Sequence, residues 1–167
     1  MKRLLLVAAV VCGSLAAAGT AGAMPSLLVT GAGASTTSGH VVVTARATGP
    51  AEGSFIPVAP ATGFVRVLGS FFGDLSGSVT CIGVGGPNAA IVSGNLDTPV
   101  VSGGFTYRNF SLLVVSRNPQ IQSWISFFPD NLTGLGPCGT SLFFAFGVPN
   151  LPNDFVVSGQ FVILGAS

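Results

Sequence analysis

The chain has 167 residues, and only 7% of them are charged, whereas charged residues make up about a quarter of an average soluble domain. A formal net charge of +1 supplies no basic surface for phosphates, which excludes a nucleic-acid-binding protein. Apolar residues make up 49% of the chain, which excludes a hydrophilic chain that stays disordered. The length allows one domain.

The first 23 residues have the pattern of a secretory signal peptide. A basic start, Met1-Lys2-Arg3, precedes an unbroken apolar run at 4–11, and the small residues Ala21 and Ala23 mark a cleavage site. Three alanines at 16–18 offer a second cleavage site. An uncleaved membrane anchor is the alternative, but the second half of the segment is rich in Ala and Gly and weakly hydrophobic.

Removal of the leader changes the charge balance of the chain. Residues 24–167 contain four arginines, five acidic residues and no lysine, a net charge of about −1. No stretch of 18 apolar residues in them is free of charge, Gly and Pro, so we predict no transmembrane helix. We therefore expect a secreted protein that is extracellular or associated with the cell envelope.

Residues 24–39 follow the predicted cleavage site and are rich in Gly, Ala, Ser and Thr from position 31 onward. This composition predicts a flexible lead-in, with a poorly packed first strand as the alternative. Gly31 and Gly33 lack the third glycine and the βαβ context of a dinucleotide-binding loop, so we expect no phosphate site there.

Residues 40–167 have the pattern of an all-β domain. Gly and Pro interrupt this part of the chain every few residues, and the segments between them are short and rich in β-branched and aromatic residues. We predict a single antiparallel β-sandwich, or a partly closed barrel, of about eight or nine strands. The candidate strands are residues 41–47, 64–68, 78–84, 89–93, 105–107 with 110–115, 123–128, 141–146 and 155–164.

Several of these strands are apolar on both faces, among them residues 41–43 and 112–115. Such strands are either covered on both sides or belong to a sheet with an unusually apolar outer face. Because so few charged residues are present, we expect the second arrangement in at least part of the sheet. Ser and Thr would then provide most of the polar surface.

Two cysteines, Cys81 and Cys138, remain after the leader is removed. An even number of cysteines in a chain that reaches an oxidising compartment predicts one disulfide. By the chain-entropy model, closing a loop of this size would stabilise the fold by about 4 kcal/mol.

The segment from Ser78 to Ser93 is the clearest local unit, a predicted hairpin with its turn at residues 85–88. Its Val79-Thr80-Cys81 motif and the following 88–94 motif, with strand 124–128, Cys138 and a closing strand at 158–163, resemble small secreted actinobacterial proteins of uncharacterised function. The resemblance implies a secreted all-β domain with a Cys81–Cys138 bond, and it implies no activity.

The sequence contains no recognisable catalytic constellation. His40 is the only histidine, so neither a catalytic triad nor a Cys/His zinc site can be assembled, and we expect it at the surface or at a strand edge. The five acidic residues stand singly in turn-like contexts, which predicts turn formers. Asp130, Asn131 and Asp154 lie in two segments with closely spaced oxygen ligands, as in extracellular calcium sites, but neither segment matches an EF-hand loop.

We therefore expect no enzymatic activity, no cofactor and no metal. The sequence predicts a secreted, non-catalytic β-domain with a structural, adhesive or cell-envelope interaction role, associating with the cell wall or with itself. One alternative is an extracellular binding module for an apolar small molecule or lipid, lined by some of the 13 phenylalanines. The other is an outer-membrane-type β-barrel, against which a single Trp and a single Tyr count, because such barrels carry aromatic girdles.

Overall fold

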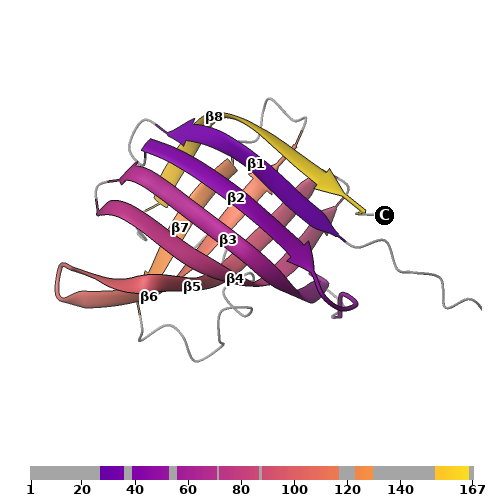
Figure 1. The fold of residues 1–167 in the computed structure, drawn as a ribbon, viewed down its shortest axis with the longest axis horizontal. Coiled ribbons are helices and arrows are strands. Elements are labelled where there is room, and N and C mark those ends of the chain that lie inside the picture. The colour runs from indigo at the N-terminus through magenta and orange to yellow at the C-terminus, as the bar shows by residue number, and fades with distance from the viewer. Residues whose placement is uncertain are drawn as a thin grey trace, which may run out of the picture.

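The structure, a computed structural model, describes residues 27–35, 39–52, 56–70, 72–86, 88–116, 123–129 and 153–165. These residues form one antiparallel sheet of eight strands (Figure 1). The strands are β1 (Leu28–Ser35), β2 (Gly39–Ala47), β3 (Val58–Ser70), β4 (Gly73–Gly86), β5 (Ala89–Ser102), β6 (Phe105–Val115), β7 (Ser123–Pro129) and β8 (Asn153–Leu164). No helix in the described part of the chain has the length and apolar character needed to cross a membrane.

The sheet closes into a barrel in which each strand pairs with its neighbours in the chain. Closure depends on β1, which pairs with β2 on one side and with β8 on the other; Leu28 lies opposite both Arg46 and Leu164. The prediction of an all-β, antiparallel fold is confirmed. The sandwich is wrong and the alternative of a barrel holds, because the eight strands form one sheet whose two edge strands pair with each other.

The expected flexible lead-in at residues 24–39 is also wrong for the eight residues of β1, and the alternative of a first strand holds there. Its small residues allow β1 and β8 to approach closely. A Cβ atom at Gly31 would lie 2.3 Å from the carbonyl oxygen of Gln160 and 2.6 Å from the ring of Phe161. The low side-chain volume that suggested flexibility is what this seam of the barrel requires.

Six of the predicted strands extend beyond the limits expected from the sequence. β3 begins at Val58 and β5 continues to Ser102, because bulges in the ladders let these strands pass through Gly and Pro positions. One of the bulges separates the pair of Asn95 with Asn109 from the pair of Val100 with Tyr107. The predicted strand at residues 141–146 lies outside the described residues.

The barrel interior is apolar and is filled by alternate side chains of the strands. On β2, for example, Val41, Val43 and Ala45 are fully buried and point inward. The largest fully buried side chains of this core come from β4, β6 and β7. They are Ile82, Phe110, Leu112, Ile125 and Phe127.

The turn between β3 and β4 adds an aromatic side chain to one end of this core. Phe72 packs its ring against Tyr107 and against Phe127, with ring centroids 6.0 Å and 5.8 Å apart. The second contact is an edge-to-face arrangement, which aromatic pairs favour. The apolar core therefore continues to the end of the barrel at which this turn lies.

Candidate functional site

The outer surface of β8, β1, β2 and β3 is the accessible side of the barrel, and we call it the open face. The pairing register arranges its outward side chains in rows that cross the four strands. One row runs Val162, Thr30, Thr44, Phe64 and the next runs Gln160, Ala32, Val42, Arg66. The two threonine hydroxyls at the centre of the first row lie 3.4 Å apart.

Large apolar side chains are exposed on this face. The exposed fractions are 45% for Phe64, 44% for Leu68, 46% for Val162 and 53% for Leu164. Single exposed apolar residues are normal in proteins, but these four belong to neighbouring rows of one surface. An apolar outer surface was expected from the sequence, and on this side of the barrel that expectation is confirmed.

Two arginines, Arg46 on β2 and Arg66 on β3, are exposed on the open face. His40, at the start of β2, is exposed there as well. Two acidic residues lie on the neighbouring strands, Asp74 at the start of β4 and Asp97 on β5. Asp97, on β5, accepts hydrogen bonds from the hydroxyls of Ser76 at 2.6 Å and Ser78 at 3.0 Å.

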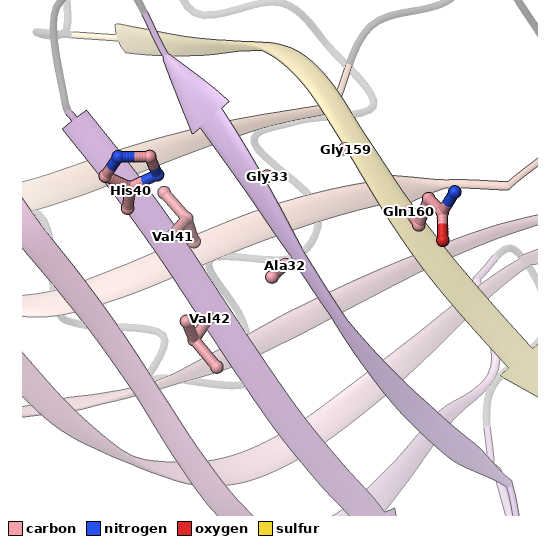
Figure 2. A pocket seen from close by; sticks show the side chains of 7 residues that line it. All are labelled: Ala32, Gly33, His40, Val41, Val42, Gly159 and Gln160. Atoms are coloured by element: carbon pink, nitrogen blue, oxygen red, sulfur yellow. The ribbon is translucent and has the colours of Figure 1, made fainter.

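A shallow, open hollow of about 750 Å³ lies at one end of the open face (Figure 2). Its floor consists of small residues, Ala32 and Gly33 on β1 and Gly159 on β8. His40 stands on one side, on β2, and Gln160 stands on the other, on β8 (Figure 2). The hollow forms because the β1–β8 seam carries almost no side-chain volume between these two polar residues.

The hollow can hold part of a partner, but its residues do not form catalytic machinery. His40 offers one imidazole and Gln160 one amide, and the floor offers no nucleophilic side chain. The described residues contain no group of three or more His, Cys, Asp or Glu placed to hold a metal ion. What the arrangement supports is contact through shape, apolar area and positive charge.

The structure places the predicted site residues separately. Cys81 is on β4 and fully buried, while Cys138 lies outside the described residues, so their disulfide stays a prediction.

The candidate calcium ligands Asp130 and Asn131 also lie outside the described residues. Asp154 lies within β8, opposite Ile125, and not in a loop as expected. The predicted leader, with Ala21 and Ala23, is outside the described residues as well.

The predicted positions of His40 and of the acidic residues have mixed outcomes. His40 is at the surface, as expected. Asp74 is a turn former, since its carboxylate accepts a hydrogen bond from the backbone N–H of Gly69 at 2.8 Å. Asp97 is not a turn former, because it lies within β5 and bridges to β4.

Arg46, Arg66 and Phe64 were not grouped on one surface by the sequence analysis. Each lies at an outward position of its strand. Strand alternation from the inward residues Val41, Val43 and Val65 would have indicated these outward positions. Their neighbourhood depends on the register between strands, which a single sequence does not contain.

Comparisons of the chain with protein-family models, with curated proteins and with solved structures found no match.

Proposed function

We propose that this chain is an exported, non-catalytic β-barrel domain that attaches to an anionic component of the cell envelope through its open face. The observation that carries this proposal is the composition of the open face. It combines four exposed large apolar side chains with the exposed arginines Arg46 and Arg66. The resemblance to small secreted actinobacterial proteins agrees with export.

The chemistry of the partner follows from the surface. Arginine forms paired hydrogen bonds with carboxylate and phosphate groups, and exposed apolar side chains gain free energy when a partner removes them from water. An envelope polymer or lipid that carries negative charge beside apolar groups satisfies both requirements. The low charge of the remaining surface reduces its repulsion of such a partner.

The two alternative functions have less support from the described residues. A binding module for an apolar ligand needs a continuous cavity, whereas the described strands direct a cluster of buried apolar side chains into the barrel interior. A membrane-spanning barrel turns polar residues inward and apolar residues outward. Here the described interior is apolar, and Arg46, Thr44 and Arg66 point outward.

Co-sedimentation of the purified chain, residues 24–167, with envelopes isolated from the producing cells tests the proposal. The double variant Arg46→Gln/Arg66→Gln is expected to lose about 2 kcal/mol of binding free energy, or about thirtyfold in affinity, because each arginine near an anionic surface contributes about 1 kcal/mol. Phe64→Asp should also weaken binding, because it places a carboxylate on the cationic surface. Rising salt should weaken binding of the parent chain.

Two matched variants control for the type of substitution. Arg108→Gln removes an exposed arginine from β6, and Val101→Asp adds a carboxylate to the β5–β6 hairpin, so both changes lie away from the open face. Both controls should bind as the parent does. Equal loss in the controls, or parental binding by the open-face variants, would refute the proposal.

A further inference from the structure

The outer surface of β4, β5, β6 and β7 differs from the open face, because its outward side chains are buried. Strand alternation shows their direction: Ile91 lies between the core residues Ala90 and Val92, and Ser111 lies between Phe110 and Leu112. Seven outward side chains, which we call the covered face, are 0–6% exposed. They are Cys81, Ile91, Ser93, Asn109, Ser111, Ser126 and Phe128.

The covered face is a continuous surface. The register places Cys81 opposite Ser93, Ser93 opposite Ser111, and Ser111 opposite Ser126, so one row crosses all four strands. The hydroxyls of Ser93 and Ser111 lie 2.6 Å apart and form a hydrogen bond that is itself buried. Outward side chains at the middle of a barrel wall are withdrawn from water only when another layer of protein lies over them.

We propose that residues 130–152 of the same chain form this layer, held in place by a disulfide between Cys138 and Cys81. The inference rests on the buried outer surface of the barrel and is independent of the proposed function. It makes this side of the domain a two-layer structure, whereas the side with the open face has one layer.

The length of the segment supports this placement. Ser126 of β7 pairs with Asn153 of β8, so the segment leaves and re-enters the barrel at neighbouring positions, where a turn of two to five residues would suffice. Cys138 follows Pro129 by nine residues, which span up to about 30 Å when extended. The row from Ser126 to Cys81 crosses three strand spacings, or about 14 Å.

The composition of the segment supports it as well. Residues 130–152 contain one charged residue, Asp130, and the apolar residues Leu142, Phe143, Phe144 and Phe146. Such a segment stabilises the fold when it covers Ile91 and Phe128 and is unfavourable in water. The described loop between β2 and β3 forms its hydrogen bonds with Val58 and Pro60 on β3 and with Val84 on β4, at the margin of the covered face.

The first experiment is peptide mapping of the non-reduced native protein. A cross-linked peptide pair containing Cys81 and Cys138 is the expected result. Free thiols at both positions would overturn the proposal, because the segment would lack the tether that places it.

The second experiment is hydroxyl-radical footprinting of Phe128 in the full chain and in the variant Phe143→Ser/Phe144→Ser/Phe146→Ser. Oxidation of Phe128 should rise severalfold in the variant, toward the rate at the exposed Phe64. The rate at Phe64 is the matched reference and should not change, and Phe110 should stay protected because it lies inside the barrel. Unchanged protection of Phe128, or protection that depends on protein concentration, would overturn the proposal.

A third measurement decides the matter if the variant also loses protection at Phe110, which would mean that it does not fold. A photo-reactive phenylalanine analogue at position 144 of the otherwise native chain should cross-link to peptides of β5, β6 or β7. Cross-links to β1, β2 or β3, or to a second copy of the chain, would overturn the assignment of the segment to the covered face.

Discussion

At the scale of single residues, the barrel depends on where side-chain volume is present and where it is absent. Phe110 is one of the largest fully buried side chains and packs in the core, whereas Gly31 leaves the space in which β1 and β8 meet. Both residues are apolar and uncharged, so the composition of the chain does not distinguish their roles. The structure distinguishes them by the atoms that a changed side chain would meet or lose.

Substitution of Gly31 by alanine should destabilise the seam of the barrel. The added Cβ meets the backbone of Gln160 at 2.3 Å, so β1 and β8 must separate, at a cost of roughly 1–3 kcal/mol. Urea denaturation measures this loss. Gly103→Asn is the control, because nothing lies within 4 Å of that position and asparagine tolerates its φ of +57°; it should change stability by less than Gly31→Ala does.

Truncation of Phe110 to alanine should cost about 3–5 kcal/mol of unfolding free energy, because it opens a cavity in a closely packed core. Phe64→Ala removes the same group from the open face and should cost less, since that ring is 45% exposed. Thermal unfolding of both variants measures the difference. Equal destabilisation would contradict the assignment of the two rings to the inside and the outside of the barrel.

At the scale of elements, β1 and the β5–β6 hairpin have opposite roles. β1 completes the wall by pairing on both sides, while the end of the hairpin projects beyond the barrel (Figure 1). Val101, near the tip of the hairpin, is 74% exposed. The turn at Gly103 and Gly104, with φ values of 57° and 81°, suits a two-residue hairpin connection of the primed type.

Removal of β1 should abolish the cooperative fold. A chain that begins at Gly39 loses two backbone ladders and the core side chain of Val29, and we expect the loss to exceed the stability of about 5–15 kcal/mol that is usual for a domain. Circular dichroism during heating should show no sharp transition. A chain that begins at Met24 is the control and should unfold as the full domain does.

The hairpin should respond locally to a substitution in its turn. Gly103→Val places a β-branched residue at a left-handed φ, at a cost of about 1–2 kcal/mol. Amide hydrogen exchange at Ser102, which pairs with Phe105 directly across the turn, should speed up by about tenfold, since 1.4 kcal/mol corresponds to that factor. Exchange at Val92, in the barrel wall, should not change; equal acceleration there would mean that the hairpin is part of the cooperative core.

At the scale of the whole molecule, the barrel has one buried outer side and one exposed outer side. The two arrangements expected for strands that are apolar on both faces therefore both occur. On β2, Val42 is partly exposed, whereas on β5 the outward residue Ile91 is buried. The open face is the accessible part of the described barrel wall, and the proposed function depends on it.

Reduction of the proposed disulfide should lower the stability of the whole domain by about 4 kcal/mol, because the reduced chain regains the conformational freedom of a long loop when it unfolds. Chemical denaturation with and without a reducing agent measures this change. The Cys81→Ser/Cys138→Ser variant is the control and should be insensitive to the reducing agent. Equal stability of the oxidised and reduced parent chains would contradict the disulfide.

The strand class could be predicted from the sequence because β-branched residues, Gly and Pro leave a local pattern. Whether the strands form one closed sheet or two stacked sheets could not be predicted. It depends on the pairing of Leu28 with Leu164, which lie at opposite ends of the described chain. The prediction of a flexible lead-in fails over β1 for a related reason, since a segment rich in small residues such as Gly31 has the same composition whether it is flexible or part of a tight seam. Phe64 on β3 and Val162 on β8 lie in one row of the open face, with β1 and β2 between them. No local sequence pattern indicates that these two residues share a surface.

The pairing of β1 with β8 also sets the order in which the molecule can form. Contacts between residues so far apart in the chain form slowly, since most of the chain must be gathered before they stabilise it. During synthesis the first strand has no partner on one side until the last strand has left the ribosome. The segment next to the proposed leader therefore stays incompletely folded until late, which is the state that the proposed export would require, because a chain is threaded across a membrane before it folds.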